Sequence, residues 1–166
     1  MKILSSIIVF SALFFSCNSP AQKKSTEKEQ KNFEITKSDA QWKAQLSSLA
    51  YNVLRHEATE PAFSSQLNDN HNKGTYVCAG CGTPVFKSKH KFDSGTGWPS
   101  FDREIEGNVA FSVDRKLGFS RTEEHCATCG GHLGHVFNDG PRETTGKRHC
   151  INGAALKFIP KDEKER

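Results

Sequence analysis

The sequence predicts a mostly β fold, built of antiparallel sheets with short helices in front of them, over residues 38–166. Three observations predict this class. From Thr75 onward, short apolar runs are separated by glycine, proline and asparagine, which is typical of short strands and tight turns. Two Cys-x-x-Cys pairs lie within this region, at 78–81 and 126–129. Before it, residues 39–56 carry apolar side chains at helical spacing.

The first helix is predicted to begin at Asp39. Ser38 is its N-cap, because a serine hydroxyl can accept a hydrogen bond from a backbone N–H of the first turn. Trp42, Leu46 and Leu49 follow at i, i+4 and i+7 and should share one buried face. The segment is therefore expected to form a short amphipathic helix.

A second short helix is predicted over residues 50–56, with Tyr51 and Leu54 on its buried side. Helical structure should stop before Pro61, because the residue that precedes a proline avoids the helical region of backbone space. The chain then continues as a β domain.

Five apolar runs predict strands, at residues 76–77, 84–86, 109–111, 117–119 and 156–159. A further strand is expected around Cys150. No internal repeat is found apart from the two cysteine pairs. The whole segment has the size of one domain.

The N-terminus is typical of an exported protein. Residues 1–16 combine a positive start with an apolar stretch that is shorter than the roughly 20 residues of a membrane-spanning helix. Cys17 follows a small residue at the end of this stretch, as at bacterial lipoprotein cleavage sites, and is predicted to carry the lipid. An ordinary signal peptide with an incidental cysteine is the alternative. Residues 17–37 are polar and predict a flexible tether. We expect a periplasmic or cell-envelope lipoprotein, attached to the membrane through its lipid only.

The charge of the chain argues against a nucleic-acid partner. The net charge is only +4, and it is evenly spread along the sequence. A zinc-ribbon protein that binds nucleic acid would carry a basic stripe with interleaved aromatic residues, and this sequence has none.

Four cysteines predict one structural zinc ion: Cys78, Cys81, Cys126 and Cys129. Paired thiolates are the ligands of closed tetrahedral zinc sites, and a glycine after each pair allows the tight turn of a zinc knuckle. The pairs are too far apart for a compact zinc ribbon, so the metal would join two distant hairpins. Two disulfides, a redox dithiol or an iron site are the alternatives.

Cys150 stands outside these pairs, beside Arg148 and His149. Nearby positive charge favours the thiolate, which is the reactive form of a nucleophilic cysteine. In a strand, Arg148, Cys150 and Asn152 point to the same face, so they predict an active-site row.

Two other segments carry residues suited to chemistry. His132 and His135 follow the second cysteine pair, and they could be further metal ligands or acid–base groups. Since four cysteines already satisfy a zinc ion, proton chemistry is the preferred reading. Trp98 lies in a Gly-Trp-Pro turn and is either the aromatic wall of a pocket or a core tryptophan.

Taken together, these segments resemble the type B methionine sulfoxide reductases over about residues 38–160. Seven motifs carry the resemblance in this order: 55–61, 78–81, 92–101, 121–123, 126–129, 132–137 and 148–152. So many motifs in the same order are highly specific, whereas no single one would be.

The resemblance implies a β-tent-like arrangement of the sheets and repair of oxidised proteins. The substrate would be the R epimer of methionine sulfoxide, preferably within proteins or peptides. Cys150 would attack the sulfoxide sulfur and become a sulfenic acid. A thioredoxin-like reductant would then restore the Cys150 thiol. The enzyme is expected to be a monomer. The implied catalytic residues are Cys150, His135 as main proton donor, His132, Asn152 and Arg148; the implied substrate-binding residues are Trp98 and Phe137; the zinc cysteines are the four named above.

Two departures from the relatives matter. Thr96 stands where many relatives carry a second, resolving cysteine, so direct reduction of Cys150 is expected. Residues 152–155 read Asn-Gly-Ala-Ala, where relatives usually show Asn-Ser-Ala-Ser. The rival class is a non-catalytic, zinc-stabilised binding module, but such a module would have no chemical need for Cys150, His135 and Trp98.

Overall fold

The computed structural model describes residues 33–161. The predicted signal peptide, Cys17 and all but the last residues of the predicted tether lie outside the described residues. Within 33–161, no helix combines the length and the apolar character needed to cross a bilayer.

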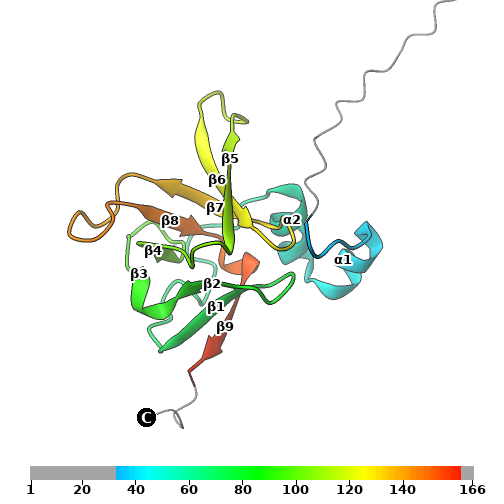
Figure 1. Cartoon of the computed structure of the whole chain (residues 1–166), viewed down its shortest axis with the longest axis horizontal. Coiled ribbons are helices and arrows are strands. Elements are labelled where there is room, and N and C mark those ends of the chain that lie inside the picture. Colours follow the sequence, from blue (N-terminus) through cyan, green and yellow to red (C-terminus); the bar gives the residue numbers. More distant parts are fainter. Residues whose placement is uncertain (1–32, 162–166) are drawn as a thin grey trace, which may run out of the picture. The chain divides into compact units, whose positions relative to one another are not determined.

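The chain forms two short helices followed by antiparallel strands, so the predicted fold class is confirmed (Figure 1). The helices are α1 (Asp39–Gln45) and α2 (Ser48–His56), and two 3₁₀ turns are η1 (Ser88–His90) and η2 (Gly153–Ala155). The strands are β1 (Gly74–Cys78), β2 (Pro84–Lys87), β3 (Lys91–Phe92), β4 (Ser100–Phe101), β5 (Val109–Asp114), β6 (Arg121–Cys126), β7 (His132–Phe137), β8 (Arg148–Ile151) and β9 (Leu156–Pro160).

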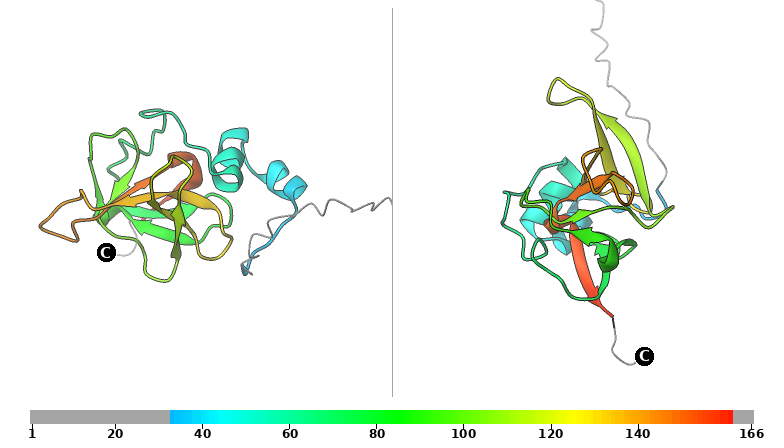
Figure 2. Two further views of the ribbon diagram at one scale, coloured as in Figure 1. Left: turned by 90° about the horizontal axis from the view of Figure 1, so that it is seen from above. Right: turned by 90° about the vertical axis from the view of Figure 1, so that its left-hand side faces the viewer.

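The strands make two sheets that share one core. One sheet has three strands in the order β2-β1-β9, and the other has six in the order β3-β4-β8-β7-β6-β5. Phe86 of the first sheet stacks on Phe101 of the second with ring centroids 4.4 Å apart. Tyr76 meets the same Phe101 ring edge-on at 4.9 Å. The views in Figures 1 and 2 show the β5–β6 hairpin extending away from the three-stranded sheet.

The helices differ from prediction at one residue. Ser38 caps α1 through a capping box with Gln41, and Trp42 is buried, as predicted. Leu49, however, is 44% exposed, so the predicted shared face was wrong. The helix ends at Leu46, which has extended backbone angles, and Ser47 caps a separate helix. The i, i+7 spacing therefore spans two helices and places Leu49 outside the core.

The strand prediction was wrong at residues 117–119. These residues form the turn of the β5–β6 hairpin, where Gly118 adopts a φ of +80° and both Leu117 and Phe119 are exposed. Strands β6 and β7 were not predicted from apolar runs, because their sequences, RTEEHC and HLGHVF, are rich in polar groups. These polar groups form the site described next.

Candidate active site and metal site

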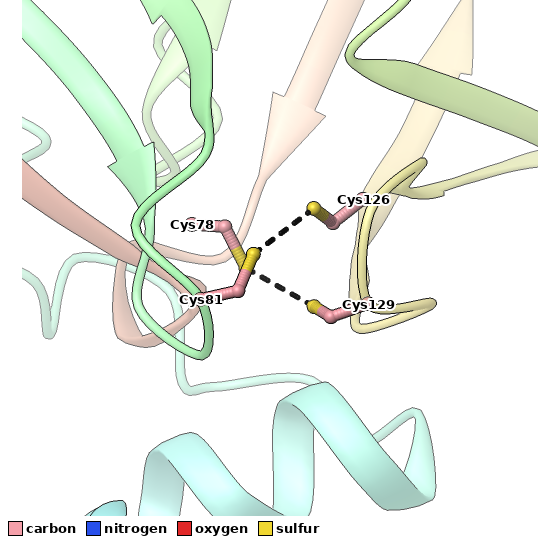
Figure 3. A group of neighbouring side chains, drawn as sticks. All are labelled: Cys78, Cys81, Cys126 and Cys129. Carbon is pink, nitrogen blue, oxygen red and sulfur yellow. Dashed lines mark hydrogen bonds between the residues drawn. The ribbon is translucent and has the colours of Figure 1, made fainter. Parts of the chain in front are cut away.

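The four predicted metal cysteines come together between the two sheets. Cys78 and Cys81 belong to the turn after β1, and Cys126 and Cys129 to the turn between β6 and β7 (Figure 3). Their sulfur atoms all lie within 4.8 Å of one another. The sulfurs of Cys78 and Cys129 are 3.7 Å apart, and those of Cys81 and Cys126 are 3.5 Å apart.

This geometry fits a tetrahedral metal better than it fits the alternative of disulfides. Zinc–sulfur bonds of about 2.3 Å place tetrahedral sulfurs roughly 3.8 Å apart, whereas a disulfide needs about 2.05 Å. All four cysteines are free thiols. Gly82 and Gly130 have positive φ angles of 81° and 69°, which confirms the tight turns expected of the two knuckles.

Both helices cover the cysteine cluster. Gln45 of α1 donates to the Gly80 carbonyl at 2.6 Å, inside the first knuckle. Arg55 of α2 donates to the Cys129 carbonyl at 3.1 Å, inside the second. The Trp42 ring lies under the Arg55 guanidinium, 5.0 Å from it. A metal bound here would thus fasten the helices as well as the two hairpins.

The register of the six-stranded sheet brings the reactive residues onto one face. Directly paired residues of antiparallel strands point to the same side, and so do residues two apart in one strand. The first row, read from β4 to β5, is Ser100, Cys150, His135, Glu123 and Ser112. The second row is Arg148, Phe137, Arg121 and Asp114. Cys150, His135, Arg148 and Phe137, which the sequence singled out, therefore share a face.

The Cys150 thiol is half-buried, and burial raises its pKa above the ordinary value of 9.0. The charge of Arg148 and the Thr96 hydroxyl, whose oxygen lies 3.9 Å from the sulfur, oppose this rise. Arg148 is fixed by a two-pronged ion pair with Asp139, both contacts being 2.9 Å, and lies over the Phe137 ring at 4.5 Å. Arg148 therefore offsets part of the desolvation that disfavours the thiolate.

The prediction that His149 adds positive charge beside the thiol was wrong. Consecutive strand residues point to opposite faces, so His149 faces the core while Cys150 faces the site. His149 is fully buried, and its Nδ1 lies 2.6 Å from the buried carboxylate of Glu124. The contact between His149 and Glu124 therefore joins β8 to β6 on the core side of the sheet.

Two acidic residues fix the histidines. His135 Nε2 lies 2.9 Å from Asp114, whose pKa is held well below its usual range by the Lys116 backbone N–H, His135 and Arg121. Burial lowers the pKa of His135 below 6.5, although the Asp114 carboxylate opposes this. The ionised Asp114 carboxylate accepts a hydrogen bond from the Nε2–H group, and this bond orients the ring.

His132 is held in the same way by Glu123. Burial works to raise the pKa of Glu123, but hydrogen bonds from His132 Nδ1 and Ser112 outweigh it and lower the pKa to about 2. The other ring nitrogen of His132 is buried without a hydrogen-bond partner among the described residues. The centroids of the two rings lie 5.4 Å apart, so the buried His132 ring packs beside that of His135.

Trp98 is only half-buried, so it is not a core tryptophan. Its indole N–H donates to the Glu60 carbonyl at 3.1 Å. Thr96, two residues before it, approaches the Cys150 sulfur. The segment that meets the nucleophile through Thr96 thus carries the indole two residues further on.

Asn152 is buried and does not extend the exposed row, contrary to prediction. Strand β8 ends at Ile151, and the Asn152 side chain donates to the Leu133 carbonyl and accepts from the Glu60 N–H, both at 3.0 Å. The Glu60 carboxylate in turn accepts the N–H groups of Gly153 and Ala154 at 2.6 and 2.8 Å. Glu60 joins Trp98 to the end of β8.

Sequence reasoning missed the roles of Glu60, Glu123 and Asp114. Glu60 and Glu123 lie inside motifs that carried the family resemblance, which was the only signal for them. Asp114 gave none, because its partner His135 is 21 residues away.

Gly153 lies where the chain leaves no room for a side chain. A Cβ atom added at Gly153 would lie 1.9 Å from the Ser65 hydroxyl oxygen. The Ser65 side chain therefore occupies the space that a serine at 153 would need.

The comparisons with known proteins identify the family of the chain. A SelR domain is matched over residues 46–160. The chain is similar to proteins named peptide methionine sulfoxide reductase MsrB. Those of Leptospira interrogans, Bradyrhizobium diazoefficiens and Thiobacillus denitrificans are 53%, 54% and 52% identical to it. Each match covers 76% of this chain, and 97%, 91% and 96% of the respective relative.

Among solved structures, the Mis18 'Yippee-like' domain covers 55% of this chain at 16% identity with a TM-score of 0.45, a likeness too low to bear on function. The SelR domain, the identities and the motifs agree that the chain belongs to the family of type B peptide methionine sulfoxide reductases.

Proposed function

We propose that this protein reduces the R epimer of methionine sulfoxide in oxidised proteins and peptides, with Cys150 as the nucleophile. The observation that carries the proposal is the common face of Cys150, His135 and Arg148, which the Thr96 hydroxyl approaches to 3.9 Å from the Cys150 sulfur. A half-buried thiol, a cation and a fixed imidazole on one face are the groups that sulfoxide reduction by a thiol requires.

The chemistry proceeds in two balanced stages. The Cys150 thiolate attacks the sulfoxide sulfur while the sulfoxide oxygen takes up protons. Oxygen is transferred, so methionine leaves and Cys150 becomes a sulfenic acid. Two thiols of a reductant then give back the Cys150 thiol, one disulfide and water.

His135 serves as the main proton donor to the sulfoxide oxygen. It is directly opposite Cys150 in the β7–β8 pairing, and Asp114 holds its ring in place. His132 acts from inside the fold, where its buried ring packs beside that of His135 with the two centroids 5.4 Å apart. Asn152 acts indirectly, by fixing the Glu60 backbone that holds the Trp98 indole.

Trp98 and Phe137 form the apolar part of the pocket. Trp98 receives the methyl group of the substrate against its ring, since sulfur–aromatic contacts are favourable by about 0.3–1.5 kcal/mol. Phe137 lies under Arg148 and keeps the guanidinium near the nucleophile. A sulfoxide is thereby held with its oxygen toward the histidines.

The cysteine cluster is proposed to bind one structural zinc ion. Cys78, Cys81, Cys126 and Cys129 would supply four thiolates, and no position would remain open for substrate. Zinc would therefore stabilise the fold without taking part in the reaction. Iron also binds four thiolates, and elemental analysis separates the two metals.

The reductant is proposed to be a thioredoxin-like protein that acts directly on the Cys150 sulfenic acid. Among the described residues, every cysteine other than Cys150 belongs to the cluster, and the side chain nearest to its sulfur in the loop is Thr96, which cannot form a disulfide. The oxidised thiol therefore has to be reached from outside.

The cellular setting follows from the sequence of residues 1–37. We propose export, lipidation at Cys17 and a tether that presents a monomeric domain in the periplasm or cell envelope. Labelling cells with a fatty acid, with Cys17→Ser as control, tests the anchor. Repair of oxidised envelope proteins is the proposed role. Unchanged envelope methionine sulfoxide after deletion of the protein and oxidant exposure would contradict it.

The reaction is tested with peptides that carry the separated R and S epimers and with a dithiol reductant. The purified, metal-loaded protein should reduce the R epimer only, and Cys150→Ser should abolish turnover. A folded, metal-loaded protein that reduces neither epimer would refute the enzyme and favour a binding module.

A further inference from the structure

Phe63 combines exposure with a strained backbone. It is 69% exposed, the highest value among the exposed large apolar residues of the described chain. Its φ angle is +62°, in the left-handed region that bulky side chains avoid. Such conformations cost about 1–3 kcal/mol and persist where the surroundings impose them, often at functional sites.

The surroundings that impose this conformation belong to the active site. The Phe63 N–H donates to the Gly97 carbonyl at 2.7 Å. Its ring lies against the same residue, since a Cβ at Gly97 would be 2.7 Å from Phe63 Cδ2. Gly97 lies between Thr96, which touches the Cys150 sulfur, and Trp98. Phe63 is therefore fixed at the rim of the pocket, next to the indole.

The start of the same loop is fixed just as firmly. Glu60, three residues earlier, accepts from the Trp98 indole and from the backbone after Asn152, and it is 2% exposed. The residues that hold the loop, Glu60 and Gly97, are both buried. The rest of the described chain nevertheless leaves most of the Phe63 side chain exposed. A ring held in this way offers its outer face to a ligand.

We propose that Phe63 binds the apolar side chain next to the methionine sulfoxide in an extended polypeptide substrate. The proposal rests on the proposed function and deepens it. With the sulfoxide at Cys150 and its methyl group on Trp98, the neighbouring residue of the substrate passes over Gly97 and reaches the Phe63 ring. Free methionine sulfoxide has no such neighbour, so this contact favours polypeptides, above all stretches that are apolar and exposed after unfolding.

Other exposed apolar residues offer a control. Phe111 is 41% exposed, and in the register of the sheet it lies opposite Glu124, on the face away from Cys150. The same substitution there removes an exposed ring without altering the rim of the pocket. Asparagine is the replacement of choice at position 63, because it tolerates the left-handed conformation and preserves the loop.

The experiment measures kcat/KM for two R-sulfoxide peptides, with leucine or with glycine on both sides of the oxidised methionine. The wild-type protein should prefer the leucine peptide by about five- to tenfold, which corresponds to covering roughly 40–60 Å² of apolar surface, and the difference should lie in KM. Phe63→Asn should lose the preference, whereas Phe63→Tyr and Phe111→Asn should keep it.

The outcomes separate this proposal from the proposed function. If the wild-type protein reduces both peptides equally, or if Phe63→Asn keeps the preference for leucine, Phe63 does not bind the neighbouring residue although the enzyme stands. If the wild-type protein reduces neither peptide, the proposed function itself is wrong. Thermal unfolding of each variant shows that the compared proteins are equally folded.

Discussion

Removal of one metal ligand gives the sharpest test of how the two hairpins are held together. The change is Cys81→Ser, chosen because Cys81 is the one partly exposed member of the cluster. Loss of its sulfur leaves no cavity in the core, so the effect reports the metal. Cys150→Ser is the matched control, since Cys150 is also a partly buried free cysteine but lies outside the cluster.

The magnitude follows from the loop that the metal closes. Cys81 and Cys126 are separated by 45 positions along the chain. A cross-link that closes a loop of this length lowers the entropy of the unfolded chain and stabilises the fold by about 4 kcal/mol. For a domain of this size, such a loss lowers Tm by roughly 10–20 °C.

The assay combines metal content with thermal unfolding followed by circular dichroism. Cys81→Ser, and the wild-type protein treated with a chelator, should both lose the metal and unfold at the lower temperature. Cys150→Ser should keep one ion per chain and the wild-type Tm. If Cys81→Ser unfolds at the same temperature as Cys150→Ser, the cluster does not hold the hairpins together.

Three further predictions test the site. Thr96→Cys should capture oxidised Cys150 as an internal disulfide, because the Thr96 oxygen already lies 3.9 Å from the Cys150 sulfur. Dimedone labels sulfenic acids, so after oxidation it should label the wild-type protein and not this variant. Equal labelling of the two proteins would contradict the prediction. The pH dependence of kcat/KM should rise up to the pKa of His135, stay level, and fall above the pKa of Cys150. The reason is that the reacting form combines a protonated His135 with a Cys150 thiolate, while the pKa of His135 lies below 6.5 and that of Cys150 above 9.0. In His135→Asn, kcat/KM should rise steadily across the range where the wild-type profile is level. An unchanged profile would assign the proton to another group. Gly153→Ser should lower the free energy of unfolding by about 1–3 kcal/mol, measured in urea, because the new side chain collides with Ser65. Ser65→Gly in the same chain should restore the stability. If the double variant stays destabilised, the collision with Ser65 is not the cause.

The sequence by itself determined the chemistry that is available. Two Cys-x-x-Cys pairs with following glycines predicted the cluster, and the structure brings their four sulfurs together. The isolated Cys150, with Arg148 two residues away, predicted the reactive face because strand geometry has a fixed period of two. The Ser38 cap predicted the start of α1, and helical spacing predicted the second helix from two residues after its observed start at Ser48, since these rules act over a few residues.

Only the tertiary structure decided how these parts support one another. Glu60 accepts from Trp98 and caps the backbone after Asn152, 92 positions away from it in the chain, and no local pattern encodes such a contact. The sequence of strand β6 is rich in charged residues and therefore does not predict a strand. It forms one because Glu123 and Glu124 each bind a histidine, on opposite faces of the sheet. Residues that bond across strands can be polar and still buried, so their placement depends on the register of the folded chain.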